Sequence, residues 1–161
     1  MHIKFVELTI NNLDKYIDRI VSIESQFPIQ IKSEIDDFRD FLEDPDSIGV
    51  IMEIDGATIG VIIGALLTSV DEEDFDIQEE KKAIYVYDFV IDINFQSKGY
   101  GMMLFREFIN LAKASGFKAL YGHFRSNTSI RLARKFSAVE IREYPDWENT
   151  DETYTLCRIE L

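Results

Sequence analysis

Short apolar runs alternate with stretches of helical periodicity along this chain. Alternating or continuous apolar residues predict strands, and apolar residues three and four positions apart predict helices. We expect strands at 2–9, 48–54, 57–67, 83–93, 117–124, 138–144 and 153–161, and helices at 11–27, 32–45, 102–114 and 126–136. The order β-α-α-β-β-β-α-β-α-β-β predicts an α/β (α+β) protein with a mixed sheet of about seven strands and about four helices.

Two features of this pattern predict how the strands are arranged. Asp55-Gly56 separates two apolar runs, which is typical of a tight hairpin. The run 83–93 is β-branched and aromatic almost throughout, so we expect a central strand buried on both faces. The acidic segment 71–80 is then the connection that leads into this central strand.

The totals favour a globular cytoplasmic protein. A chain of 161 residues fits one domain, 1–161, and is long enough to bury a core. No apolar run reaches the roughly 18 residues that a membrane span needs, and the N-terminus lacks a signal-peptide pattern. The lone cysteine, Cys157, lies in a strand-like run and has no partner for an internal disulfide.

The charge is strongly acidic, with a net value of −13. This excludes nonspecific nucleic-acid binding, which needs a basic surface. The segments 33–46 and 71–80 each hold seven acidic residues. Two interpretations stay open: solvated loops and helix faces, or acids that surround a site for a cationic substrate.

The segment NFQSKGYGMMLF, 94–105, joins the central strand to a helix through Lys98, Gly99 and Gly101. A helix start exposes unpaired N–H groups and positive partial charge, and glycines let the backbone approach an oxygen closely. The junction is therefore either a plain turn or an anion site. It fits neither G-x-G-x-x-G, because position 104 is leucine, nor the G-x-x-x-x-G-K-[ST] phosphate loop.

The remaining pattern, Q-x-x-G-x-G at Gln96, Gly99 and Gly101, resembles the signature of the GNAT superfamily of N-acetyltransferases. The resemblance covers essentially the whole chain and implies a mostly antiparallel central sheet. It also implies that this loop holds the pyrophosphate of acetyl-CoA, with no metal. The cofactor-binding residues that it implies are Ile91, Ile93, Gln96, Ser97, Lys98, Gly99, Tyr100, Gly101, Met102 and Asn127.

A second stretch, SIRLARKFSA at 129–138, is similar to a later helix of that family. The tyrosine that serves as general acid in many members falls at Ala133, so the acid role has no occupant on this helix. The family's asparagine falls at Ser126 by strict spacing, with Asn127 one place away. The basic residues near this helix are candidates for contact with CoA phosphates or form a solvated face: Arg125, Arg131, Arg134 and Lys135.

Candidate catalytic residues lie on the central strand. IYVYDFVI resembles a strand of diamine and polyamine acetyltransferases, with Asp88 at its aspartate and Tyr87 in place of its glutamate. Asp88 is the first candidate for the base, and Tyr85 is the alternative. Strand alternation puts Tyr85 and Tyr87 on one face and Asp88 on the other, unless a bulge intervenes. Tyr121 and His123 are weaker candidates.

The resemblance implies an acetyl-CoA-dependent N-acetyltransferase in which a primary amine attacks the thioester directly in a ternary complex. The acceptor is a small cationic amine such as a polyamine, or a protein amine, and the sequence does not choose between them. The alternative function is a non-catalytic acyl-CoA-binding domain of the same fold. A homodimer is common in the family.

Overall fold

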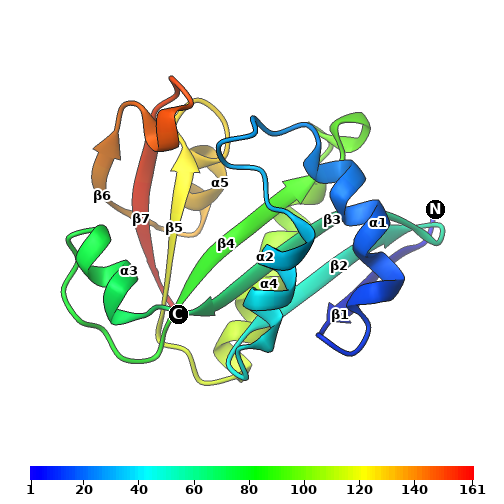
Figure 1. The fold of residues 1–161 in the computed structure, drawn as a ribbon, viewed down its shortest axis with the longest axis horizontal. Coiled ribbons are helices and arrows are strands. Elements are labelled where there is room, and N and C mark those ends of the chain that lie inside the picture. The colour runs from blue at the N-terminus through cyan, green and yellow to red at the C-terminus, as the bar shows by residue number, and fades with distance from the viewer.

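One seven-stranded sheet forms the centre of the molecule in the computed structural model, which describes residues 1–161 (Figure 1). The elements in chain order are β1 (Ile3–Leu8), α1 (Leu13–Glu24), α2 (Ile35–Glu43), β2 (Ile48–Ile54), β3 (Ala57–Leu66), α3 (Ser69–Asp74), β4 (Ala83–Ile91), η1 (Ile93–Phe95), α4 (Tyr100–Ala114), β5 (Ala119–Arg125), α5 (Ile130–Lys135), β6 (Val139–Tyr144), η2 (Trp147–Asn149) and β7 (Tyr154–Glu160).

The predicted fold class is confirmed. The strand order is β1-β2-β3-β4-β5-β7-β6, and every neighbouring pair is antiparallel except β4 and β5. The run 83–91 is the central strand, as expected, and the hairpin between β2 and β3 turns at Asp55 and Gly56, which both have positive φ. Two adjacent left-handed residues match the right-handed twist of a hairpin.

The structure adds a fifth helix, α3, inside the acidic connection. Thr68 and Asp71 form a capping box there: the Asp71 N–H donates to the Thr68 hydroxyl, and the Thr68 N–H donates to the Asp71 carboxylate. A capping box satisfies two backbone donors at a helix start, which makes so short a helix stable. The sequence pattern does not predict this helix, because the segment has almost no apolar periodicity.

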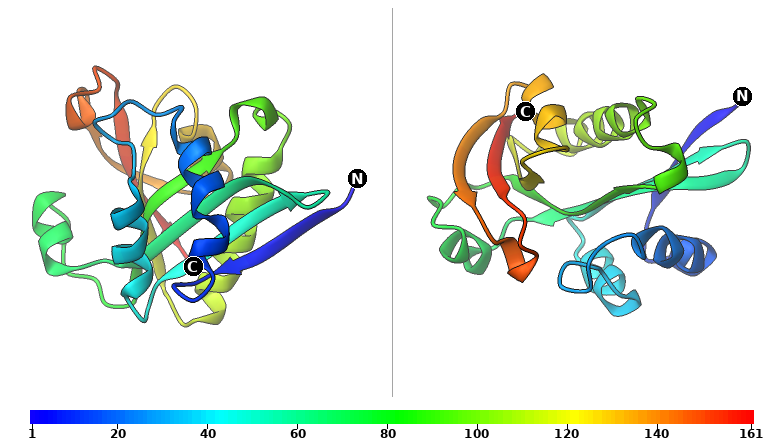
Figure 2. Two further views of the ribbon diagram at one scale, coloured as in Figure 1. Left: turned by 45° about the vertical axis from the view of Figure 1, so that its right-hand side comes forward. Right: turned by 90° about the horizontal axis from the view of Figure 1, so that it is seen from above.

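Helices cover both faces of the sheet (Figure 2). On one face, α1 and α2 bury Leu13, Ile17, Ile20 and Phe38 against β3 and β4. On the other face, α4 buries Leu104, Phe105 and Phe108 against β2, β3 and β4, and α5 packs beside β5 and β7. Seen from above, α3 lies on the same side of the sheet as α1 and α2 (Figure 2). No helix is both long and apolar enough to span a bilayer.

Candidate active site

The sheet opens between β4 and β5. These parallel strands pair only from Ala83 to Tyr85 with Ala119 to Tyr121. Beyond this point the two strands separate (Figure 1), and the segment 86–91 of β4 has a partner strand, β3, on one side only. The pairing of β4 with β5 therefore has a gap along 86–91, and the unpaired edge of β4 offers backbone donors and acceptors to an extended ligand.

At the wide end of this gap, residues 92–102 form a loop and helix start that we call the anion loop. Asp92 accepts a hydrogen bond from the Asn94 N–H at 2.8 Å and forms an ion pair with Arg19 of α1. These contacts hold the pKa of Asp92 below its usual value, the backbone bond contributing most. The Gln96 side-chain amide donates to the Ile91 backbone carbonyl at 2.9 Å and to the side-chain Oε1 of Gln26 at 2.6 Å. The loop is therefore tied to β4 and to the end of α1.

The backbone of the anion loop presents a run of free donors. Ser97 and Gly99 have φ values of +61° and +86°. None of the seven amide N–H groups from Gln96 to Met102 donates to an acceptor in the chain. The first turn of the 15-residue helix α4 contains no acidic side chain, and the exposed Lys98 adds positive charge. Unpaired amides, a helix N-terminus and a lysine together suit a phosphate-bearing anion.

The predicted cofactor-binding residues are brought together only in part. Those of the anion loop are contiguous, but the Gln96 side chain is engaged with Ile91 and Gln26, so only its backbone is available. Ile93 is exposed on η1. Asn127 is exposed in the turn after β5, and because β4 and β5 are parallel this turn lies at the same edge of the sheet as the anion loop. The helix α5 begins at Ile130, four residues later than expected, and the hydroxyl of its N-cap residue Ser129 accepts from the Arg125 N–H.

The basic residues near α5 differ in how they are paired. Arg125 and Arg134 form ion pairs with Glu152 and Glu140. Arg131 and Lys135 form none. The first two are therefore less available to a phosphate than the second two.

The structure corrects the expected placement of Asp88. A bulge in β4 inserts Tyr87 between the residues opposite Ile63 and Gly64 of β3. Tyr85, Tyr87 and Asp88 consequently share the face that α1 and α2 cover. The Tyr85 and Tyr87 rings meet at 4.7 Å, Tyr87 stacks on Phe41 of α2 at 4.8 Å, and Asp88 meets Glu24 of α1. Strand alternation alone predicted opposite faces because it counts no extra residue.

Asp88 is a buried carboxyl group. One of its carboxyl oxygens, Oδ2, has no hydrogen-bond partner. Burial, and then the neighbouring Glu24, raise the pKa of Asp88 well above its ordinary value. A buried carboxyl group with a raised pKa beside a gap in the sheet is a candidate acid–base group.

His123 of β5 lies across the gap from Asp88 inside an aromatic box. The imidazole stacks on Trp147 with ring centroids 3.9 Å apart and meets Phe75 and Tyr144 at 4.4 and 5.0 Å. The Tyr85 hydroxyl is hydrogen-bonded to His123 Nδ1 at 2.5 Å, and Nε2 has no partner. Burial lowers the pKa of His123 to about 3, so the imidazole is neutral at neutral pH, and burial raises the pKa of Tyr85.

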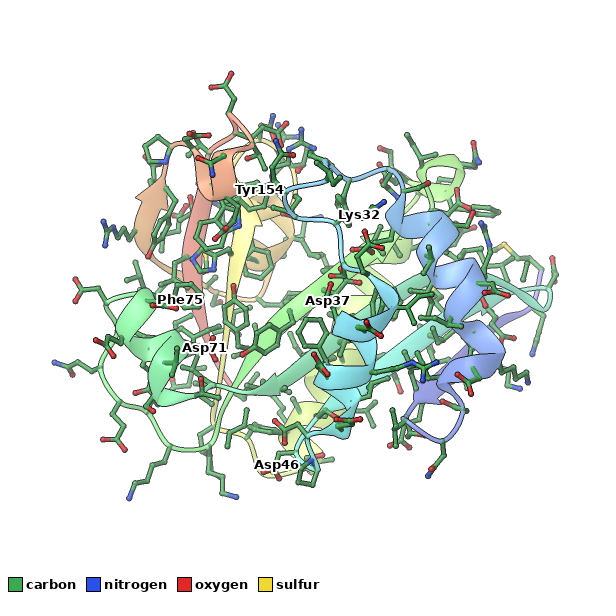
Figure 3. All side chains as sticks on the ribbon, viewed as in Figure 1. Lys32, Asp37, Asp46, Asp71, Phe75 and Tyr154 are labelled. Atoms are coloured by element: carbon green, nitrogen blue, oxygen red, sulfur yellow. The ribbon has the colours of Figure 1, made fainter.

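Acidic side chains and a contact between two loops lie around the face of β4 that carries Tyr85, Tyr87 and Asp88 (Figure 3). Asp71 accepts a hydrogen bond from the Tyr87 hydroxyl at 2.6 Å. In Figure 3, Asp71 and Phe75 of the α3 region lie to one side of the front of β4, and Asp37 and Lys32 lie to the other. Gln30, before α2, donates to the Asn149 carbonyl at 3.3 Å and so links the loop between α1 and α2 to the loop between β6 and β7.

Neither the candidate Tyr121 nor position 133, where the family's tyrosine would fall, supplies a free hydroxyl for the acid role. The Tyr121 hydroxyl donates to Glu80, which also binds Arg158, and burial together with Glu80 raises the pKa of Tyr121 to about 12. Ala133 is buried on α5 and offers no hydroxyl. No group of three or more His, Cys, Asp or Glu side chains is placed to hold a metal ion.

Four residues of this region were not predicted: Glu24 of α1, Phe75 just after α3, Tyr144 of β6 and Trp147 of η2. Glu24 carries a signal that could have found it, because it follows Ile20 by four residues and continues the apolar stripe of α1. Nothing in the local pattern distinguishes Phe75 and Tyr144 from ordinary core residues. Trp147 stands out only as the single tryptophan of the chain. Their association with His123 and Asp88 follows from the tertiary fold alone.

Comparison with known proteins agrees with this geometry. The sequence model of the acetyltransferase (GNAT) family matches residues 16–137. No curated protein matches the sequence. Among solved structures, a mosquito arylalkylamine N-acetyltransferase like 5b is 20% identical, with a TM-score of 0.74 over 99% of this chain and 100% of that one.

Two bacterial structures are similar to the same extent. A putative acetyltransferase from Salmonella typhimurium, solved with its cofactor acetyl-CoA, is 15% identical with a TM-score of 0.75, covering 100% of this chain and 95% of that one. A ribosomal-protein alanine N-acetyltransferase from Escherichia coli is 15% identical with a TM-score of 0.74, covering 99% and 94%. Identities this low show the fold and leave the acceptor open.

The match of the family model over most of the length confirms the expected acyltransferase class: the chain belongs to the acetyltransferase (GNAT) family.

Proposed function

We propose that residues 1–161 form one domain that transfers the acetyl group of acetyl-CoA to a primary amine by direct attack in a ternary complex. The observation that carries this proposal is the run of seven unpartnered amides from Gln96 to Met102 at the wide end of the gap between β4 and β5. A pyrophosphate on these amides would place the rest of the cofactor beside the open edge of β4. The similar Salmonella structure, solved with acetyl-CoA, supports this choice of anion.

The open edge of β4 also suits the chemistry of the thioester. A backbone N–H on this edge, near Ile91, donates to the oxyanion that develops on the carbonyl. Asp88 accepts the proton that the ammonium group of the acceptor must lose before it can attack. Tyr85 positions His123 rather than exchanging a proton itself, because its hydroxyl is hydrogen-bonded and its pKa is raised.

The acceptor in this proposal is a cationic amine, such as a polyamine or a protein amine. Its approach side carries Asp37 and Asp71 and belongs to a chain with a net charge of −13. A field of one sign concentrates ligands of the opposite sign. The aromatic walls around His123 add flat apolar surface on which the carbon skeleton of an amine can pack.

The experiment combines calorimetric titration with acetyl-CoA and a thiol-release assay on a panel of amines. The panel contains a diamine, a polyamine, an arylalkylamine and two peptides that offer an N-terminal amine or a lysine. We expect binding of acetyl-CoA and thiol release with at least one amine. Failure to bind acetyl-CoA would refute the proposal entirely.

A second candidate function is a non-catalytic acyl-CoA-binding domain, and the observation that favours it is Ala133. This residue leaves α5 without a hydroxyl to protonate the departing thiolate. Water can protonate a thiolate, so the substitution alone does not prevent catalysis. Binding of acetyl-CoA without thiol release from any amine of the panel would support the non-catalytic function.

A further inference from the structure

Two buried carboxyl groups meet where α1 crosses β4. Glu24, in the last turn of α1, is fully buried, and Asp88, beside the β4 bulge, is 6% exposed. The two side chains are neighbours, and the charge of Glu24 raises the pKa of Asp88 beyond the effect of burial. Each carboxyl group also has one oxygen with no partner, Glu24 Oε2 and Asp88 Oδ2.

The surroundings supply little to offset two negative charges. Glu24 Oε1 accepts the Ser33 N–H at 3.1 Å. Lys32 is the cation that acts on Glu24 from the loop between α1 and α2, and Asp37 of α2 adds a further negative charge near Asp88. From β4, the Tyr87 hydroxyl faces the other way, toward Asp71. Two adjacent buried carboxyl groups with so little compensation titrate as a coupled pair, because each negative charge disfavours ionisation of the other group.

The place of this pair is unusual for a purely structural feature. Asp88 lies three residues beyond Tyr85, the last residue of β4 that pairs with β5, so the pair is next to the mouth of the gap. A protein core gains nothing from unsatisfied carboxyl oxygens, because burying an unpaired polar atom costs stability. Unsatisfied buried groups in a native structure call for a functional explanation.

We propose that Glu24 and Asp88 act as one proton-accepting unit that takes the proton of the acceptor's ammonium group. This inference rests on the proposed function and deepens it, since it adds Glu24 as a residue of the catalytic site. The competent form is the fully ionised pair, and after the transfer the proton is shared between the two carboxylates. The unit then releases it to solvent before the next turnover.

The ammonium nitrogen loses one proton to the pair and becomes a neutral amine. Its lone pair forms the new C–N bond to the acetyl carbon, and the C–S bond breaks, so that CoA leaves as a thiolate. The second proton lost from the nitrogen passes to this thiolate, directly or through water, which yields the amide and free CoA.

A pair suits this task better than a single carboxylate. An ordinary carboxylate, with a pKa near 4, is a weak acceptor for the proton of an alkylammonium group. A like charge alongside raises the pKa and brings it toward the operating pH, where general-base catalysis is most effective. Glu24 therefore contributes by making Asp88 a stronger base.

The test compares pH profiles of kcat/KM for the wild type, Glu24→Gln and Asp88→Asn, with Glu72→Gln as a control. Glu72 is a buried carboxyl group of α3 that lines a cavity of about 480 Å³ at the far end of β4, away from the anion loop. We expect the wild-type activity to rise with pH through an apparent pKa above the ordinary carboxyl range. Glu24→Gln should lower the apparent pKa of this rise by about one pH unit or more, because the neighbouring negative charge is removed. Asp88→Asn should lower kcat about 100-fold, and Glu72→Gln should leave the profile unchanged.

A measurement that needs no catalysis tests the carboxyl pair independently of the proposed function. Carbon-13 NMR of protein labelled in its Asp and Glu carboxyl groups follows the titration of Asp88 in the wild type and in Glu24→Gln. A lower midpoint in the variant supports the pair, and the same midpoint in both folded proteins overturns it. Identical pH profiles for the two active proteins would also overturn the role of Glu24. Absence of turnover in the wild type, with binding of acetyl-CoA intact, would instead refute the proposed function and any catalytic role of the pair.

Discussion

The anion loop and the acceptor face, which carries the Glu24–Asp88 pair and the aromatic box, are built in opposite ways. The anion loop consists of backbone amides from one contiguous segment, 92–102. The acceptor face consists of side chains from α1, β4, β5 and the loop regions around α3 and η2. The first depends on local backbone conformation, and the second depends on how distant segments pack. Variants should therefore affect binding of the cofactor and use of the acceptor separately.

The largest expected effect comes from Gly99→Asp in the anion loop. Gly99 has a φ of +86°, which costs a non-glycine residue about 1–2 kcal/mol. The new carboxylate would also repel a pyrophosphate at the helix N-terminus. We expect the Kd for acetyl-CoA, measured by calorimetry, to rise about 100-fold or more, since about 1.4 kcal/mol corresponds to a factor of ten.

Gly116→Asp is the matched control for this variant. Gly116 has a φ of +91° just after the other end of α4, and neither glycine has an atom within 4 Å of an added Cβ. The control should lose a similar amount of stability and keep its affinity for acetyl-CoA. Equal losses of affinity in both variants would show that the anion loop does not hold the cofactor.

The second largest effect concerns His123 of the acceptor face, and it is measured as the pH dependence of the free energy of unfolding. Burial lowers the pKa of His123 to about 3 in the folded chain, against about 6.5 in an unfolded chain. Between these values the unfolded state binds more protons, so the free energy of unfolding falls as the pH drops below 6.5. This loss is about 1 kcal/mol for each pH unit.

His123→Gln removes the titrating group and keeps an acceptor for the Tyr85 hydroxyl. Denaturant unfolding at pH 6.5, 5.5 and 4.5 should show a shallower dependence on pH in this variant than in the wild type. His2→Gln, at the exposed N-terminus, is the control and should follow the wild type. If the free energy of unfolding of His123→Gln depends on pH as steeply as that of the wild type, burial does not hold His123 neutral.

A smaller effect is expected for Trp147→Ala, which removes one wall of the aromatic box. The stacking of Trp147 on His123 is worth about 1 kcal/mol beyond its buried area. The KM for the best amine should rise by up to about fivefold, while the Kd for acetyl-CoA stays constant. Phe136→Ala, which removes a partly buried aromatic ring from the α4 face, should not change the KM for the amine. A change in the Kd for acetyl-CoA in Trp147→Ala would contradict the separation of the two regions.

The smallest effect is expected for Gly101→Ala, which tests whether a ligand approaches the backbone of the anion loop at this position. An added Cβ would lie 3.8 Å from Phe89 and 3.9 Å from Ile91, which is ordinary contact. Alanine is the better helix former, so the free energy of unfolding should rise by up to about 1 kcal/mol. If a ligand approaches the backbone here, the affinity for acetyl-CoA should fall several-fold while the protein becomes more stable. An unchanged affinity would mean that acetyl-CoA approaches the backbone closely at Gly99 and its neighbours and not at Gly101.

Most of the fold could be predicted because its signals are local. The periodicity of α1, the Asp55-Gly56 turn and the apolar run of β4 each depend on residues close in sequence. The helix α3 escaped prediction because its capping box, from Thr68 to Asp71, stabilises a segment that buries little apolar surface. The bulge at Tyr87 escaped because it depends on the register of β4 against β3.

The sequence by itself determined the strand and helix order, the family resemblance and the position of the anion loop. These are properties of contiguous residues whose backbone conformation follows from their own chemistry. Only the tertiary structure decided the acceptor face. The bulge turns Asp88 toward α1, where Glu24 is buried beside it, and the packing of α3 and η2 encloses His123. A single residue inserted in a strand reverses the face of every residue beyond it, and no local pattern records that reversal.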